Sequence, residues 1–248
     1  MAAMTAIALQ QSEPRTPPPG LREELARLRA TTEALDTGAL LDYALTQAFP
    51  GRIAAVSAFG AESVVLLHHI ARIDPATPVL FLNTGKLFGE TLRYRDRLQD
   101  VLGLTDIRAI GPHPEDRNRL DAEGTLWSRN PDACCDFRKT VPLGRALAGF
   151  DATVTGRKRF QTAARSGMAR IELADGRLRF NPLVAWTQDD LTRYIEDHRL
   201  PKHPLVNDGY LSIGCLPCTR RVSPGEGYRT GRWVGLDKDE CGMHGDGI

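Results

Sequence analysis

The segment "RIAAVSAFGAESVVLLHHIARI", residues 52–73, indicates the fold class. Its first part, 52–58, is a short apolar run with a β-branched residue, which predicts a buried strand. Residues 62–73 have helical character, and the turn at 56–63 joins strand to helix. Such a turn presents backbone N–H groups to an anion. It matches neither the P-loop nor the dinucleotide-binding pattern, and a plain structural turn also accounts for it.

The same alternation continues along the chain. Residues 78–84 predict a second buried strand, and 89–103 predict a helix that Gly103 ends. Two further strands are expected at 106–110 and 151–156, with helical sequence between them. Alternating strands and helices predict an α/β fold, a parallel sheet flanked by helices, with ligands at the carboxyl ends of the strands.

The flanking segments give additional elements. Helical spacing of leucines predicts helices within 21–35 and 38–49. Asp175-Gly176 between two alternating runs predicts a hairpin over 170–180. Thr187 and Asp190 have capping-box spacing, which predicts a helix over 187–198.

The domain organisation follows from composition. The first 20 residues end in Pro-Pro-Pro-Gly, which is typical of a disordered lead-in. Residues 21–248 are predicted to form one domain. From about residue 200, proline and glycine abound and periodicity fades, so we expect a loop-rich, mobile C-terminal tail.

The overall charge excludes some classes of partner. The chain has 248 residues and a formal net charge of +1, so no global field favours nucleic acid or a membrane surface. No apolar run approaches the ~20 residues of a membrane helix. The start of the chain lacks the charged region of a secretory signal. We therefore expect a cytoplasmic protein with reduced thiols.

The cysteines fall into three groups. Cys134 and Cys135 are adjacent, Cys215 and Cys218 form a CxxC, and Cys241 is alone near the carboxyl terminus. CxxC is a metal-chelating spacing, and together the first two groups make a set of four thiolates. Adjacent ligands converge on a single zinc ion only with strain, whereas a [4Fe–4S] cluster offers each thiolate its own iron. The spacing therefore favours the cluster; structural zinc, four unrelated buried cysteines and a redox CxxC remain alternatives.

Cys241 differs from the other four because nothing pairs with it if they hold a cluster. His244 follows three residues later, close enough to assist a thiolate. The sequence favours a nucleophile over an incidental exposed thiol.

Basic residues cluster after the expected strands. Two loops, 56–63 and 81–91, follow neighbouring strands and predict a nucleotide-sized crevice. In a nearly neutral chain, local cations at this edge suit a compact polyanion, although several are expected to be solvated surface residues. The basic residues concerned are Lys139, Arg157, Lys158, Arg159, Arg165, Arg220, Arg221, Arg229 and Arg232.

Seven segments in this order resemble the adenylyl-sulfate and phosphoadenylyl-sulfate reductases of sulfate assimilation. They are "SAFGAES", "FLNTGKLFGET", "CCDFRK", "TGRKRFQTAARS", "NPLVAWTQDDL", "GYLSIGCLPCT" and "ECGMH". The double cysteine followed by CxxC is similar to the branch that carries a [4Fe–4S] cluster and uses adenylyl sulfate (APS). The resemblance implies a PP-loop fold related to the ATP pyrophosphatases.

The resemblance also implies roles for individual residues. Cys134, Cys135, Cys215 and Cys218 would hold the cluster, and Cys241 would be catalytic. The nucleotide would contact Ser57, Phe59, Gly60 and Ser63, with Leu82 and Gly156 near the adenosine. The phosphosulfate would face Lys139, Arg165, Arg229, Arg232 and His244.

The implied reaction is a thioredoxin-dependent reduction of APS to sulfite and AMP through an S-sulfocysteine on Cys241, with Lys139 between cluster and substrate. A homo-oligomer is also expected. Two departures stand out: Asn83 replaces a usual aspartate, and the loop Phe160–Ala164 differs, although Gln161 remains.

Three rival functions stay open at this point. Phosphoadenylyl sulfate (PAPS) is a near alternative substrate, since one more phosphate needs only one or two more cations. An ATP pyrophosphatase with zinc on the four cysteines would need a stronger SGGxDS-like loop. A non-catalytic zinc-binding module leaves the two nucleotide loops unexplained.

Overall fold

A six-stranded sheet organises the computed structural model, which describes residues 18–223, 225–235, 238 and 240. The strand order is β3-β2-β1-β4-β6-β5, and only β5 runs antiparallel to its neighbour. This mostly parallel sheet confirms the predicted fold class. The strands are β1 (Ile53–Ser57), β2 (Val79–Leu82), β3 (Ile107–Ile110), β4 (Ala152–Thr155), β5 (Ile171–Ala174) and β6 (Arg177–Phe180).

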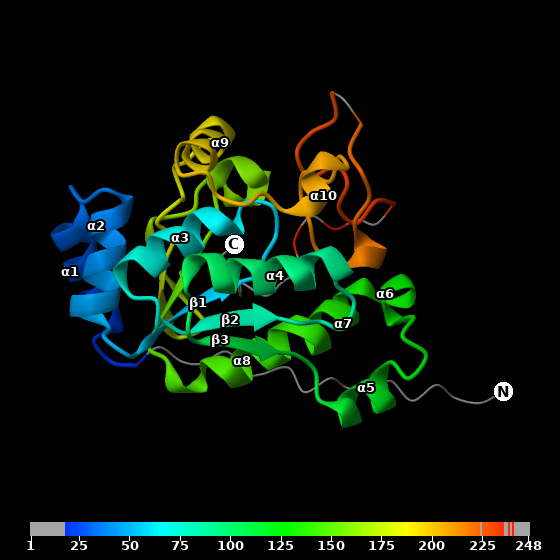
Figure 1. Cartoon of the computed structure of the whole chain (residues 1–248). Helices are drawn as coiled ribbons and strands as arrows, with labels where there is room; N and C mark the ends of the chain where they lie inside the picture. Colours follow the sequence, from blue (N-terminus) through cyan, green and yellow to red (C-terminus); the bar gives the residue numbers. More distant parts are fainter. Residues whose placement is uncertain (1–17, 224, 236–237, 239, 241–248) are drawn as a thin grey trace.

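Helices cover both faces of the sheet. In Figure 1, α3 and α4 lie on one side of the strands and α8 on the other. The α-helices are α1 (Leu21–Thr32), α2 (Thr37–Asp42), α3 (Ser63–Ile73), α4 (Gly89–Leu102), α5 (Pro114–Leu120), α6 (Leu126–Arg129), α7 (Pro131–Cys135), α8 (Val141–Ala146), α9 (Gln188–Asp197) and α10 (Pro204–Asn207). Two π-helical turns, Tyr43–Ala48 and Asp136–Thr140, continue α2 and α7.

The central strands are apolar throughout because both of their faces are buried. In β1, Ile53 and Ala55 belong to the main core with α3 and α4, while Ala54 and Val56 pack towards α8. All five residues of β1 are buried. The expectation of a strand buried on both faces is confirmed.

The predicted ends and turns are also present. Gly103 ends α4 in the left-handed conformation, with φ at 69°. Thr187 and Asp190 form the capping box at the start of α9. Asp175 and Gly176 both have positive φ and turn β5 into β6, which confirms the hairpin.

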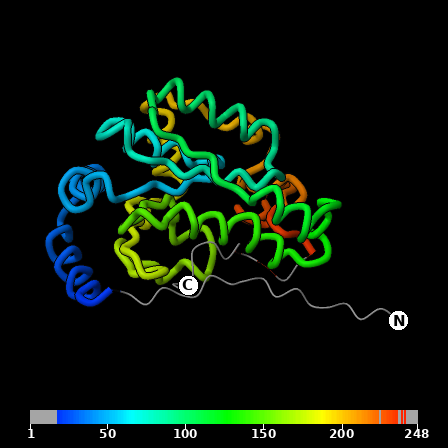
Figure 2. Tube along the Cα trace, turned by 90° about the horizontal axis from the view of Figure 1, so that it is seen from below, coloured from blue at the N-terminus to red at the C-terminus, as the bar shows by residue number. Residues whose placement is uncertain are grey.

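In the described chain after Leu200, the helices are α10 and one 3₁₀ turn, Leu216–Cys218. Figure 2 shows the N-terminal helices at one end of the molecule and this orange segment at the other, beside the green helices that precede β4. The lead-in predicted for residues 1–20 lies mostly outside the described residues. The single-domain boundary stays a prediction.

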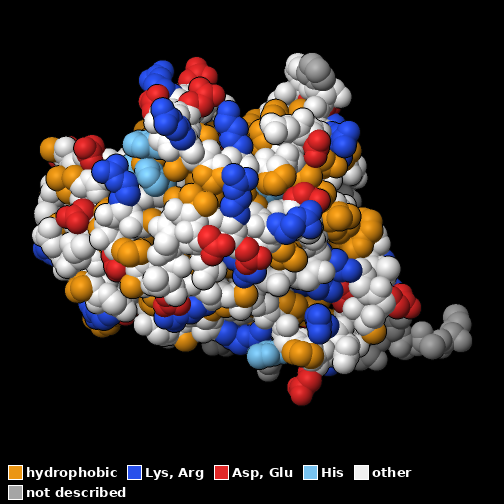
Figure 3. All heavy atoms as spheres, in the orientation of Figure 1, with side chains coloured by type: hydrophobic (Ala, Val, Ile, Leu, Met, Phe, Trp, Pro, Cys, Tyr) orange, Lys and Arg blue, Asp and Glu red, His pale blue; other side chains and the backbone are white. Residues whose placement is uncertain are grey.

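The surface suits the near-neutral composition. Acidic and basic side chains are interspersed over the face drawn in Figure 3. Within the described residues, every helix is too short or too polar to cross a bilayer.

Candidate active site

An open crevice lies at the carboxyl ends of β1, β2 and β4. This is the edge where a parallel sheet binds ligands. The structure brings together nine of the eleven residues that the resemblance assigns to substrate. They are Ser57, Gly60, Ser63, Leu82, Lys139, Gly156, Arg165, Arg229 and Arg232.

The loop after β1 forms the floor of this crevice. Ser57 ends the strand, and its Oγ accepts the Phe59 backbone N–H at 3.1 Å. Phe59 has a positive φ of 49° and points its ring into the core, 5.1 Å from the ring of Phe81. The side chain of Phe59 is fully buried and does not line the crevice, so its contribution is to fix the loop.

Two buried ion pairs hold the loop after β4. Arg157 pairs with Glu172, and Lys158 pairs with Glu62 at the start of α3. Burial lowers the pKa of Lys158, and burial lowers the pKa of Arg157 to about 10. These two cations are thus balanced within the fold. Their first role is structural, unlike that of the cations further along the loop.

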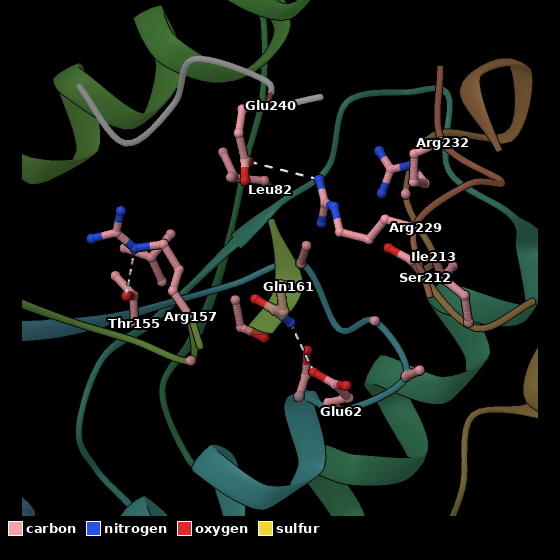
Figure 4. Close-up of a pocket in the computed structure, with 18 of the residues that line it drawn as sticks. Glu62, Leu82, Thr155, Arg157, Gln161, Ser212, Ile213, Arg229, Arg232 and Glu240 are labelled. Carbon is pink, nitrogen blue, oxygen red and sulfur yellow. Dashed lines mark hydrogen bonds and ion pairs between the residues drawn. The ribbon is translucent and has the colours of Figure 1, made fainter. Parts of the chain in front are cut away.

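Arg165 and Arg229 face the tail instead. The Arg165 Nε lies 2.7 Å from the Glu240 carboxylate, and the Arg229 Nη2 lies 3.7 Å from it. Figure 4 shows Glu240 extending towards Arg229 at the mouth of the crevice. Gln161 connects Arg165 to Glu62. Its side-chain oxygen accepts from Arg165, and its side-chain nitrogen donates to the Glu62 carboxylate at 2.9 Å.

The Arg232 guanidinium lies close against the backbone of Gly214. A Cβ at this position would lie 2.3 Å from the guanidinium, so a larger residue would require the Arg232 side chain to shift. On its other side, the guanidinium lies 4.3 Å from the ring centroid of Trp233. This segment lies against the CxxC, since the backbone N–H of Trp233 donates to the Cys218 carbonyl at 3.1 Å.

The four paired cysteines line one cavity, although 79 residues (136–214) separate the two pairs. Cys134 and Cys135 end α7, Cys215 precedes the 3₁₀ turn Leu216–Cys218, and Cys218 ends it. Lys139 lines both this cavity and the crevice, and its Nζ lies 3.7 Å from the Cys135 Sγ. The two sites are therefore adjacent.

The chemistry of this cavity suits a bound cationic group. Burial raises the pKa of the Cys134 thiol to about 11, and burial also raises that of Cys218. Four neighbouring thiolates would therefore need a compensating charge. Among the described residues, no three Cys, His, Asp or Glu side chains are arranged around a single metal ion.

Two buried donors, one lining this cavity and one packed against its cysteines, support the same fit. Among the described atoms, the Trp233 indole N–H and the Arg138 Nε have no hydrogen-bond partner. Trp233 packs against Cys135 and Cys218, and Arg138 lines the cavity. A buried donor without an acceptor is costly, and the sulfurs of a [4Fe–4S] cluster would supply acceptors there. The residues therefore fit this group.

The loop after β2 connects the cavity to the crevice. The Thr84 Oγ1 lies 3.2 Å from the Cys215 Sγ, and the Leu216 N–H donates to the Lys86 carbonyl at 2.7 Å. Arg138 donates to the Thr84 carbonyl at 2.7 Å and pairs with buried Asp121 at 2.6 Å. These contacts bring segments distant in sequence to one place.

Asn83 does not line the crevice. Its Oδ1 accepts the Gly85 N–H at 3.2 Å, and the residue faces a separate surface hollow between β2 and β3. An asparagine amide oxygen accepts the backbone N–H of such a turn as well as an aspartate carboxylate does. The side chain in this position thus shapes the loop.

Some crevice residues were missed in the sequence. They are Glu62, Ser212, Ile213, Tyr228 and Glu240, which lie on loops or at a helix start without a distinctive local pattern. The only available signal for Glu240 is its place before Cys241. Cys241 and His244 lie outside the described residues.

Fold and site together define a PP-loop-like α/β protein with a nucleotide-sized crevice beside a cysteine cavity. The fold is shared with the FMN adenylyltransferase of Candida glabrata in complex with FAD and pyrophosphate (TM-score 0.53, 13% identity), which covers 87% of this chain and 73% of that one. A phosphoadenylyl-sulfate reductase from Candida auris has a TM-score of 0.69 at 24% identity, over 87% of this chain and all of the other.

The family model for the phosphoadenosine phosphosulfate reductase domain matches residues 52–221, and the chain belongs to this family of enzymes. The adenosine 5'-phosphosulfate reductase of Mesorhizobium japonicum is 48% identical over 229 residues, which are 92% of this chain and 90% of the relative. That of Rhodococcus opacus is 36% identical over 233 residues, 90% and 94% respectively. The resemblance predicted from the sequence is confirmed.

Proposed function

We propose that this chain reduces APS to sulfite and AMP, with thioredoxin as the reductant and Cys241 as the nucleophile. One observation carries the proposal: the four cysteines line a cavity that shares Lys139 and Cys215 with the nucleotide-sized crevice. The relatives that bear the name adenosine 5'-phosphosulfate reductase cover nearly the whole chain, which supports APS as the substrate.

The chemistry needs no flavin or nicotinamide. The Cys241 thiolate attacks the sulfur of the sulfo group, the S–O bond to the phosphate breaks, and AMP leaves as a stable anion. A thioredoxin thiolate then attacks the Cys241 Sγ and releases sulfite. The second thioredoxin thiol resolves the mixed disulfide, so the dithiol supplies both electrons.

The cations of the crevice make this attack possible, because a thiolate and a phosphosulfate repel each other. One pair of unit charges at ~4 Å is worth about 4 kcal/mol at an effective dielectric of 20. Lys139, Arg165, Arg229 and Arg232 line the crevice and would offset the repulsion. By the family resemblance, His244 would also contact the phosphosulfate.

A [4Fe–4S] cluster on Cys134, Cys135, Cys215 and Cys218 completes the proposed site. When bound, the cluster would supply fixed charge beside the phosphosulfate, with no electron transfer required of it. Lys139 would orient the substrate from its place next to Cys135. A thioredoxin-linked reaction belongs in the cytoplasm, and assembly into a homo-oligomer stays a prediction.

Turnover with APS and PAPS, measured side by side as sulfite release with thioredoxin, tests the function. We expect APS to be preferred and Cys241→Ser to lose sulfite release entirely. Anaerobically purified protein should be brown, with broad absorbance near ~400 nm. Cys218→Ser should lose this absorbance and Cys241→Ser should keep it. Preference for PAPS, or sulfite release by Cys241→Ser, would contradict the proposal.

A further inference from the structure

Glu240 places a carboxylate where the proposed substrate would place an oxyanion. Its Oε1 lies 2.7 Å from the Arg165 Nε, and its Oε2 accepts from the Arg165 Nη2 at 2.7 Å. The Thr162 hydroxyl donates to it at 3.1 Å, and Arg229 approaches at 3.7 Å. The Glu240 side chain is only 10% exposed. The crevice thus binds its own anion.

The bidentate geometry matters because it uses the Nε–Nη2 edge of Arg165. This edge is the one that binds two oxygens of a carboxylate, phosphate or sulfo group side by side. The Nη1 of Arg165 is used as well, since it donates to Gln161. Arg165 therefore cannot present its Nε–Nη2 edge to a substrate while Glu240 remains bound.

Glu240 differs from Glu62, which also lines the crevice, and from Glu172 of β5. Glu62 and Glu172 neutralise Lys158 and Arg157 within the sheet framework. Glu240 instead comes from the tail, directly before Cys241. Its departure would leave the framework pairs intact and would carry the neighbouring residue with it.

We infer that Glu240 is an internal surrogate for the substrate oxyanion, which holds the Arg165–Arg229 subsite in the ligand-free protein and is displaced when phosphosulfate binds. The inference rests on the proposed function, since it takes the phosphosulfate to be the displacing anion. Free sulfate would have to compete with the Glu240 carboxylate for this subsite.

Binding by a chain that cannot turn over separates this role from an anchoring one. In a Cys241→Ser background, Glu240→Gln keeps the shape of the side chain and removes its charge. We expect Glu240→Gln to bind APS about tenfold more tightly by calorimetry, because the subsite is no longer blocked in most molecules. Adenosine, which has no anion to compete, should bind equally to both chains.

The matched control is Glu226→Gln, which removes an exposed carboxylate paired with Arg220 outside the crevice. It should change the affinity for neither ligand. Equal or weaker APS binding by Glu240→Gln would overturn the inference and would indicate an anchor for the tail.

Inorganic sulfate distinguishes this failure from failure of the proposed function. If the Cys241→Ser parent binds APS no better than adenosine, the proposed function is wrong. The sulfate arm still decides the role of Glu240: tighter sulfate binding by Glu240→Gln supports the surrogate, and unchanged sulfate binding contradicts it.

Discussion

Two walls of the crevice satisfy their buried polar groups differently. The sheet-edge wall, residues 57–63 and 156–165, pairs Lys158 with its own Glu62 and Arg157 with Glu172 of β5. The cysteine wall, residues 134–139, 215–218 and 229–233, keeps raised thiol pKa values and, within the described chain, indole and guanidinium donors without acceptors. The first wall thus neutralises two of its cations within the fold, although the Glu62 Oε1 has no hydrogen-bond partner among the described residues. The second wall keeps thiols and donors that suit a bound group.

Breaking a charge pair in the sheet-edge wall should have the largest effect on stability. Lys158→Met leaves the buried Glu62 carboxylate without its cation, and such a loss costs about 3–5 kcal/mol in the free energy of unfolding. Urea denaturation measures it. Adding Glu62→Gln should restore much of the loss.

Lys202→Met is the control for this experiment, because Lys202 pairs with Glu196 on the exposed surface. It should cost less than about 1 kcal/mol. If Lys158→Met were no more destabilising than Lys202→Met, the sheet-edge wall would not depend on its internal pairs.

Lys139 tests whether the two walls act together. Lys139→Ala removes the cation that lies against both sites, and we expect kcat/KM for APS to fall about 100-fold. The iron content should stay unchanged, because Lys139 is not a thiolate ligand. Arg145→Ala, an exposed cation on α8, should leave both values unchanged. Unchanged turnover by Lys139→Ala would show that the two walls function independently.

The smallest effect concerns the segment that leads into the cysteine wall. His203 is fully buried, and its Nδ1 accepts the Leu205 N–H at 3.2 Å, so Nε2–H faces the Thr91 hydroxyl. Burial lowers the pKa of His203 to about 4. As the pH falls, the imidazole is therefore protonated at a higher pH in the unfolded chain than in the folded one. The free energy of unfolding decreases as the pH falls below about 6.5.

Between pH 7 and pH 5, this histidine should account for about 2 kcal/mol of lost stability. Between these two pH values, the free energy of unfolding of His203→Gln should fall by about 2 kcal/mol less than that of the unsubstituted protein. Exposed His113→Gln should leave the pH dependence unchanged. An unchanged slope in His203→Gln would mean that the segment tolerates a buried imidazolium.

The fold could be predicted from local sequence because each helix or strand has its own residue pattern. The apolar run of β1, the stop at Gly103 and the capping box of Thr187 depend on neighbours within a few residues. The convergence of Cys134 with Cys215 was also predictable, since the thiols share a chemistry that suggests one ligand.

The rest depended on contacts between residues distant in sequence. Nothing near Glu62 indicates that Lys158 will neutralise it, 96 positions later. For the same reason, Arg157 and Lys158 looked like substrate cations in the sequence but are framework pairs in the structure. Charge alone does not show which of several arginines has its guanidinium available to a ligand. The contact between the Glu240 carboxylate and Arg165 was also not predicted.

The π-helical turn at Asp136–Thr140 sets how Lys139 is aimed. Such a turn contains one residue more than the ordinary winding, and each residue of an α-helix advances the direction of the side chain by about 100°. Removing one residue ahead of Lys139 would restore regular winding and leave the helix after the turn in register, but Lys139 would then follow Cys135 by three residues instead of four. The ammonium group would approach the Cys135 sulfur from a different angle, so the extra residue of this turn contributes to the alignment of the two sites.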